Sequence, residues 1–177
     1  MKKLLILFLM LPMLAFAQKE GNKTKYEEFA SKSGVFTVIN YEVPTVELVA
    51  AYGEGKYTRK VSFSLIKMIV GNTSSTFLSI LHSDYSHASS AMLEASDVKA
   101  LYNAIKEMMA KRQTPKPEGA TNVKYIFLGN DGVSVECDNE SWTIKLEKFS
   151  EDKIWIKDIT PLSNRLQEVI QQIDSIL

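Results

Sequence analysis

The chain has 177 residues, of which 45% are hydrophobic and 24% are charged, and its 21 basic and 21 acidic side chains give a formal net charge of zero. This length supports one domain with a substantial core. A surface without net charge has no field that attracts polyanions, which argues against nucleic acid or an anionic membrane as a general partner. Cys137 is the only cysteine, so an intramolecular disulfide is excluded and stability must come from packing.

Residues 1–17 have the pattern of a cleavable bacterial signal peptide. Two lysines precede an apolar run over residues 4–14, and Ala15 and Ala17 form a small-x-small cleavage motif. The run is shorter than the roughly 20 apolar residues that span a bilayer, which argues against a membrane anchor. No cysteine lies at the cleavage site, so we expect an exported protein, secreted or periplasmic, that begins at Gln18 and is not a lipoprotein.

The N-terminal segment, residues 18–34, predicts a short helix. Thr24 and Glu27 have the spacing of a capping box at its start. Gly34 is a residue type that ends helices, so we expect the helix to stop there.

Strands are expected after this helix. Runs rich in β-branched and aromatic residues predict them over residues 35–41, 46–52, 61–70, 76–82 and 87–93. The apolar positions of the third run are odd-numbered up to Leu65 and even-numbered from Ile66 to Val70, which predicts a β-bulge within that strand.

The period then changes to that of a helix. Ser96 is placed to cap it, an apolar stripe runs from Val98 to Met109, and basic residues near Arg112 suit its C-terminal dipole. Residues 114–119 hold two prolines and a glycine, and they predict a surface connection.

A second series of strands is predicted over residues 123–128, 133–137, 142–147 and 153–157. The first of these is apolar on both faces, which predicts a central position in its sheet. Alternation places the thiol of Cys137 on an apolar face, where free cysteine behaves as a small buried hydrophobe. Thr160 and Pro161 then begin an amphipathic helix that continues towards the end of the chain.

These elements predict an α+β fold, with two amphipathic helices packed on one face of an antiparallel β-sheet in a single domain of residues 35–177. Residues 35–112 and 122–177 share an order of several strands followed by a helix. Two explanations stay open, an internal duplication of the (βββα)2 type or the ordinary order of elements in an α+β domain.

Residues 90–105 (SAMLEASDVKALYNAI) read as a strand that runs into a capped helix. With the leader and the single domain, this stretch resembles small secreted proteins of Bacteroidetes type that carry domain-of-unknown-function labels. The resemblance covers a small part of the chain, holds no chemical signature and supplies no catalytic residues.

The two histidines, His82 and His87, lie close together, and a hairpin between them would make them neighbours across two strands. Asp84 or Asp97 would then be a third metal ligand. Structural zinc usually takes four protein ligands, and an aspartate in a turn commonly bonds to its own backbone. We therefore expect no metal site, and no change in metal content or melting temperature when either histidine is removed.

Patterns that carry catalysis are missing from the sequence. The serines near the histidines include Ser79, Ser83 and Ser90, and none lies in a Gly-x-Ser-x-Gly nucleophile turn. A glycine-rich phosphate-binding motif is also missing. We therefore predict no enzyme, no catalytic residue and no cofactor. The alternative is a small hydrolase or metal-dependent enzyme that uses the hairpin from His82 to His87.

Two features favour binding. A glycine-containing segment combines Tyr52, Lys56, Tyr57 and Arg59, a composition that suits a recognition loop, although an ordinary solvated hairpin turn explains it as well. Trp155 lies between two isoleucines in a predicted strand, so its side chain points to the opposite face from theirs. It is either a platform that stacks on a peptide or a sugar ring, or a core residue that contacts a helix.

The sequence therefore predicts an exported, non-catalytic module that binds a protein, peptide or glycan, with no nucleic acid partner and no stable membrane anchor. A further alternative is a carrier of a lipophilic ligand, which requires an empty apolar cavity of at least about 300 Å³.

Overall fold

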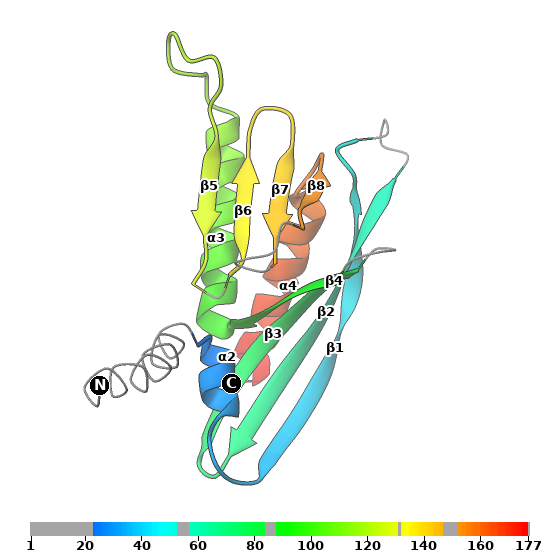
Figure 1. Cartoon of the computed structure of the whole chain (residues 1–177), viewed down its shortest axis with the longest axis vertical. Helices are drawn as coiled ribbons and strands as arrows, with labels where there is room; N and C mark the ends of the chain where they lie inside the picture. Colours follow the sequence, from blue (N-terminus) through cyan, green and yellow to red (C-terminus); the bar gives the residue numbers. More distant parts are fainter. Residues whose placement is uncertain (1–22, 53–56, 84–87, 131, 147–151, 177) are drawn as a thin grey trace, which may run out of the picture.

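Figure 1 shows the computed structural model, which describes residues 23–52, 57–83, 88–130, 132–146 and 152–176. The leader predicted for residues 1–17 lies outside these ranges. Of the helices that are described, none combines the length and the apolar character needed to cross a bilayer.

The first half of the chain is a four-stranded antiparallel sheet between two helices, the short α2 (Lys25–Ala30) and the longer α3 (Ala95–Arg112). The strands pair in chain order, and α3 follows the last of them directly. They are β1 (Phe36–Val49), β2 (Thr58–Val70), β3 (Thr73–Ser83) and β4 (Ala88–Glu94).

The second half has the same order with shorter strands, again paired antiparallel in chain order, and it ends in α4 (Thr160–Ile176). The strands are β5 (Tyr125–Leu128), β6 (Ser134–Cys137), β7 (Trp142–Lys145) and β8 (Ile154–Ile156). The α+β class is confirmed, since four antiparallel strands precede a helix in each half. A duplication of the halves stays a prediction.

A seam of backbone contacts joins the two sheets where β8 lies beside the end of β1. Ala50 and Ile156 form an antiparallel bridge. Two hydrogen bonds of 3.0 Å lie on either side of this bridge. The amide of Ala51 donates to the carbonyl of Trp155, and the amide of Lys157 donates to the carbonyl of Val49 in β1. The structure therefore has two sheets joined at an edge, where we predicted one sheet.

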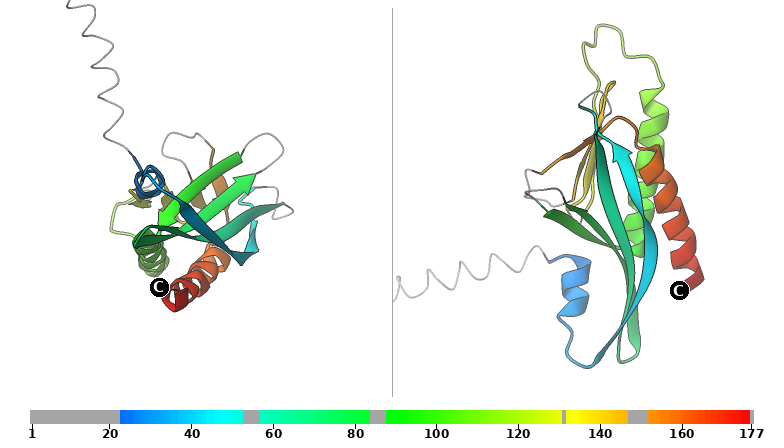
Figure 2. Two further views of the ribbon diagram at one scale, coloured as in Figure 1. Left: turned by 90° about the horizontal axis from the view of Figure 1, so that it is seen from below. Right: turned by 90° about the vertical axis from the view of Figure 1, so that its right-hand side faces the viewer.

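Helices α3 and α4 lie on the same side of the two sheets (Figure 2) and share one core with them. Leu65 and Leu78 from the first sheet, Ile144 from the second, and Ile105 and Leu166 from the helices are all buried in this core. Each half thus covers its apolar side chains with help from the other, as layered α+β architectures do.

The phase change in β2 reflects two buried faces, and the bulge that we predicted there is wrong. β2 and β3 keep an unbroken register from Val61 to Val70. The odd-numbered residues up to Leu65 face the main core, whereas Met68 and Val70 form a second cluster with Phe29 of α2. The two ends of one strand are therefore covered on opposite faces.

The bulge lies in β1 instead. The register between β1 and β2 shifts between Val43 and Val46, in the segment that contains Pro44. Proline lacks the amide that a ladder needs, so within sheets it is found at edges and bulges. β1 continues through the irregularity, and the strands predicted over residues 35–41 and 46–52 belong to one strand.

β5 lies at an edge of the second sheet, whereas we predicted a central strand. Among the described strands it pairs with β6 alone, and Ile126 and Leu128 are 54% and 75% exposed. Only Tyr125 and Phe127, on the other face, pack against the core. The prediction was wrong because the apolar outer face that we interpreted as buried is open to solvent.

The capping signal is confirmed for α2 and wrong for α3. The hydroxyl of Thr24 accepts from the amide of Glu27 at 3.2 Å, and the Glu27 carboxylate accepts from the amide of Thr24 at 2.8 Å, which is a complete capping box. Helix α2 ends at Ala30 with Ser31 as its C-cap residue, so the expected end at Gly34 is wrong. The N-cap residue of α3 is Glu94, so Ser96 lies within the first turn.

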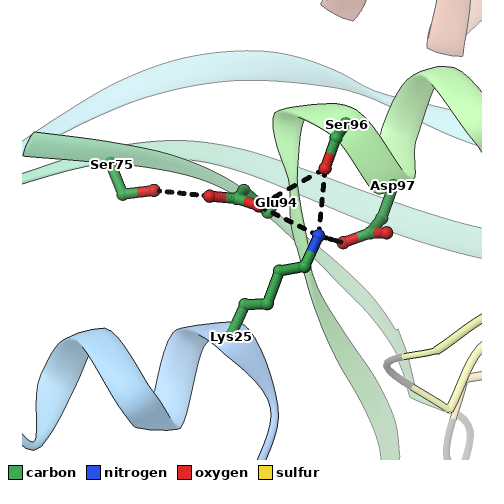
Figure 3. A network of polar contacts seen from close by, with 5 residues as sticks. All are labelled: Lys25, Ser75, Glu94, Ser96 and Asp97. Atoms are coloured by element: carbon green, nitrogen blue, oxygen red, sulfur yellow. Dashed lines mark hydrogen bonds and ion pairs between the residues drawn. The ribbon is translucent and has the colours of Figure 1, made fainter.

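A polar network attaches α2 to the junction of β4 and α3 (Figure 3). The ammonium group of Lys25 lies 3.0 Å from a carboxylate oxygen of Glu94 and 3.0 Å from one of Asp97, and it donates to the Ser96 hydroxyl at 3.1 Å. The other oxygen of Glu94 accepts from the hydroxyl of Ser75 at 3.1 Å. One lysine thus pairs with two carboxylates and holds α2 against the first sheet.

These contacts shift the pKa values of Glu94 and Lys25. Burial raises the pKa of the Glu94 carboxyl, but hydrogen bonds from Lys25 and Ser75 outweigh burial and lower it below its usual value. Hydrogen bonds to Asp97 and Glu94 raise the pKa of Lys25. Since the pKa of Glu94 is lower in the folded chain, its carboxylate stabilises the fold above the usual value of about 4.3. That contribution is lost as pH falls through the folded pKa.

The substitution Glu94→Gln removes this charge and keeps the shape of the side chain. We expect it to lower the free energy of unfolding at pH 7 by about 0.5–1 kcal/mol, a small value because the pair is partly exposed. The difference should shrink as pH falls through the lowered pKa of the Glu94 carboxyl, because the wild-type side chain then becomes neutral. Urea unfolding at pH 7 and at low pH measures it. Glu107→Gln, at the exposed pair with Lys111, is the matched control and should have a smaller effect. A Glu94→Gln deficit of equal size at both pH values contradicts the role of charge.

Candidate functional site

The β1–β2 hairpin brings together Tyr52, Tyr57 and Arg59, which we call the aromatic tip. The amide of Ala50 donates to the carbonyl of Tyr57 at 2.8 Å, which holds the two sides of the hairpin together. The centroids of the two tyrosine rings are 6.1 Å apart, and their planes meet at 36°. Three of the predicted binding residues are thus neighbours, while Lys56 lies outside the described residues.

Arg59 orders the aromatic tip. Its Nη2 donates to the hydroxyl of Tyr52, and its Cζ lies 5.4 Å from the centroid of the same ring. A guanidinium over an aromatic face is attracted by the quadrupole of the ring. Tyr52 and Tyr57 are 44% and 59% exposed, so the tip presents two aromatic faces to solvent. These groups suit recognition of a ligand through stacking and hydrogen bonds.

Trp155 lies on β8, next to the strand that leads into the aromatic tip. Its side chain is 50% exposed, while Ile154 and Ile156 on either side of it are buried, so the predicted opposite orientation is confirmed. The carbonyl of Trp155 accepts from Ala51, the residue before Tyr52. The structure thus places Trp155 one strand away from the tip, on the uncovered face of the second sheet.

The histidine hairpin differs from our prediction. The register pairs His82 with Ser89, so His87 is not its cross-strand neighbour. His87 and Asp84 lie outside the described residues. Asp97, the other proposed ligand, is paired with Lys25. Within the described ranges, no group of three or more histidine, cysteine or acidic side chains is arranged to hold a metal ion.

The side chain of His82 has a structural role. It is 7% exposed, and its Nδ1 donates to the backbone carbonyl of Lys60 at 2.9 Å. A general base in a catalytic triad is oriented by a third polar side chain, and the hydrogen bond of His82 goes to the backbone instead. This bond ties β3 to β2, and it satisfies a ring nitrogen that would otherwise be buried without a partner.

A groove that no sequence motif indicated lies between the end of α3 and the start of α4. The groove has a volume of about 340 Å³, and its walls include Arg112, Trp142 and Asp158. Arg112 donates to the carbonyl of Asn139 at 2.8 Å, with its Cζ 5.5 Å from the ring of Trp142. The Asp158 carboxylate accepts from the amide and hydroxyl of Thr160. Arg112 and Asp158 are thus both engaged in structural contacts.

Among the described core residues, the space between the sheets and the helices is too small for a lipophilic ligand. The void between the two sheets and the helices, lined by residues such as Val61, Ile80 and Leu162, holds about 10 Å³. A carrier requires an apolar cavity of at least about 300 Å³. The core void is far smaller, and the larger groove is open and partly polar.

Comparison of the chain with models of protein families, with curated proteins and with solved structures finds no match. Functional inference therefore rests on the residues and their geometry.

The substitution His82→Ala removes the bond to Lys60, and we now expect it to lower stability. Losing this hydrogen bond together with the packing of the buried His82 ring should cost about 1–3 kcal/mol, which thermal unfolding measures. Metal content, measured by mass spectrometry, should not change. His87→Ala is the comparison variant, for which we keep the prediction of no effect. An unchanged melting temperature in His82→Ala, or loss of a stoichiometric metal, contradicts this role.

The thiol of Cys137 is buried, as predicted, and burial raises its pKa above the usual value. Since the thiolate is the reactive form, we expect the native protein at pH 8 to react with Ellman's reagent about a hundredfold or more slowly than the unfolded chain. Absorbance with and without guanidinium measures the two rates. Equal rates in the two conditions contradict a buried thiol.

Proposed function

We propose that this protein is an exported, non-catalytic binding module whose aromatic tip contacts a protein or peptide partner. The observation that carries the proposal is the exposed pair of Tyr52 and Tyr57, with Arg59 bonded to the first of them. The leader pattern of residues 1–17 supports export.

The chemistry of the aromatic tip is that of interface hot spots. Tyrosine, tryptophan and arginine are the residues whose removal costs most at protein interfaces. Tyrosine offers a large contact area with few rotatable bonds, so it loses little entropy when it binds. Arg59 already restrains Tyr52 before any ligand arrives, which reduces that cost further. Trp155, one strand away, is a further exposed aromatic residue.

A polypeptide fits these groups better than the glycan that the sequence left open. Arg59 and the tyrosine hydroxyls pair with backbone carbonyls and carboxylates, and the rings pack on aliphatic, aromatic or prolyl side chains. Two rings inclined at 36° form an uneven surface, which suits the varied side chains of a peptide.

The double variant Tyr57→Ala/Arg59→Ala tests this function. The chain from residue 18 to 177 is applied to arrays of peptides and of glycans, and the strongest ligand is then titrated by calorimetry. We expect a peptide ligand and an affinity loss of about tenfold to a hundredfold in the variant, because truncated hot-spot residues cost more than 1 kcal/mol each.

The control variant is Lys116→Ala/Glu118→Ala, on the exposed connection between α3 and β5 that projects from the body (Figure 2). It changes two exposed side chains away from the tip, and it should bind as the wild type does. Equal affinity in the tip variant and the wild type, with both folded by circular dichroism, rules out the tip as the binding surface.

A further inference from the structure

We propose that the free edge of β5 binds an extended segment of a partner polypeptide, which adds to the second sheet as a further strand. This surface is separate from the aromatic tip, and the inference goes beyond the proposed function. It rests on the backbone register of β5, its exposed side chains, an adjoining cavity and the charges nearby.

The register shows which backbone groups of β5 are directed outward. The amide of Gly129 donates to the carbonyl of Val133 at 2.7 Å, and the ladder continues from this pair into β5 and β6. In an antiparallel ladder the hydrogen-bonded residues alternate, so Ile126 and Leu128 direct their N–H and C=O groups away from β6. Over the described ranges, no strand lies beyond this edge (Figure 1).

The side chains of the same two residues are exposed and apolar. Native sheet edges usually carry a charge, a proline or a bulge that prevents further pairing. β5 has the sequence YIFL, without a charge or a proline, and its register with β6 has no irregularity. An added strand with apolar residues at alternate positions would cover Ile126 and Leu128 on the outer face and complete the hydrogen bonds of the edge.

A cavity of about 90 Å³ adjoins the C-terminal end of β5. Its apolar wall includes Phe127 of β5, together with Leu93 of β4 and Leu101 of α3. Successive side chains of a strand point to opposite faces. The residues of the added strand that do not contact Ile126 or Leu128 therefore point to the inner side, where this cavity accepts a small aliphatic side chain.

Charges on the outer face favour an acidic segment. Lys124 lies 2.9 Å from the carboxylate of Glu136. The hydrogen bond from Lys124 lowers the pKa of this carboxyl, and the charges of Lys153 and Lys145 add to the effect. Three lysines thus act on this one carboxylate, and Asp138 acts on Lys124 as well. The remaining positive charge favours an acidic residue next to the apolar ones.

A second copy of this chain fits the edge less well. Pairing two β5 strands joins four residues from each copy. Such a contact buries far less than the roughly 1,200 Å² of a stable interface. It also brings two lysine-rich faces side by side. A partner segment longer than β5 avoids this repulsion and fills the cavity as well.

Synthetic seven-residue peptides with an N-terminal aspartate provide the probe for the chain from residue 18 to 177. In the first set, valine, isoleucine or leucine alternates with threonine along the peptide. The second set has the same composition, but its apolar residues are next to one another. We expect the alternating set to bind about tenfold or more tightly. Two N-methylated versions of the best peptide are then compared, one methylated at the odd-numbered amides and the other at the even-numbered amides. One version should lose binding and the other should keep it, because only one edge of the peptide bonds to β5.

Ile126→Pro is the decisive variant, since it removes an outward N–H group and no bond to β6. Proline is tolerated at sheet edges, so we expect the variant to fold and to lose about tenfold or more in peptide affinity. Ile126→Thr keeps the amide and the β-propensity, and as the matched control it should retain more of the binding. If circular dichroism shows that Ile126→Pro is unfolded, Leu128→Asp replaces it, because the added charge repels the acidic peptide without changing the fold.

Several results would overturn the proposal: equal binding of the two peptide sets, equal binding of the two N-methylated versions, or full affinity in the folded edge variant. A dimer in analytical ultracentrifugation that Ile126→Pro converts to a monomer would assign the edge to a second copy instead. The variant Tyr57→Ala/Arg59→Ala should bind these peptides as the wild type does. Failure of the edge proposal is therefore distinguishable from failure of the aromatic tip.

Discussion

The hydrogen bonds between β8 and the end of β1 determine where the exposed surfaces of this protein lie. They bracket the bridge between Ala50 and Ile156 and join the second sheet to the first. Because β8 is occupied on both sides by this seam and by β7, the strand at the opposite end, β5, becomes an edge. The same seam places Trp155 beside the strand that leads to the aromatic tip, and it lets α3 and α4 cover both sheets with one core.

The helices cover one side of the sheets, so the surfaces suited to recognition lie at the tip of the hairpin and on the outer side. α2 covers part of the first sheet, where Phe29 packs with Phe77 and Lys25 pairs with carboxylates at the start of α3. The second sheet has no such cover among the described residues. Its outer face therefore exposes Ile126 and Trp155 to solvent. An exposed apolar residue on a folded surface is common, but apolar residues along an unpaired strand edge are a recognised route to strand addition.

Residues that suggested chemistry in the sequence have structural partners in the fold. The ring of His82 bonds to a backbone carbonyl, the carboxylate of Asp97 pairs with Lys25, and the thiol of Cys137 lies in the core. Buried polar groups need such partners, because an unsatisfied group costs free energy. The aromatic tip is the part of the predicted site that the hairpin does assemble, since Tyr52 and Tyr57 flank one turn and Arg59 follows on the same strand.

Interactions between residues close in sequence were predictable: the capping box of α2, the alternation that buries Cys137, and the apolar stripes of α3 and α4. By itself the sequence thus determined the main elements and the α+β class. It did not determine that α2 covers one face of β2, that β5 lies at an edge, or that His82 pairs with Ser89. The tertiary structure decided these features, because strand order, register and burial depend on segments that are distant along the chain and meet only when it is packed.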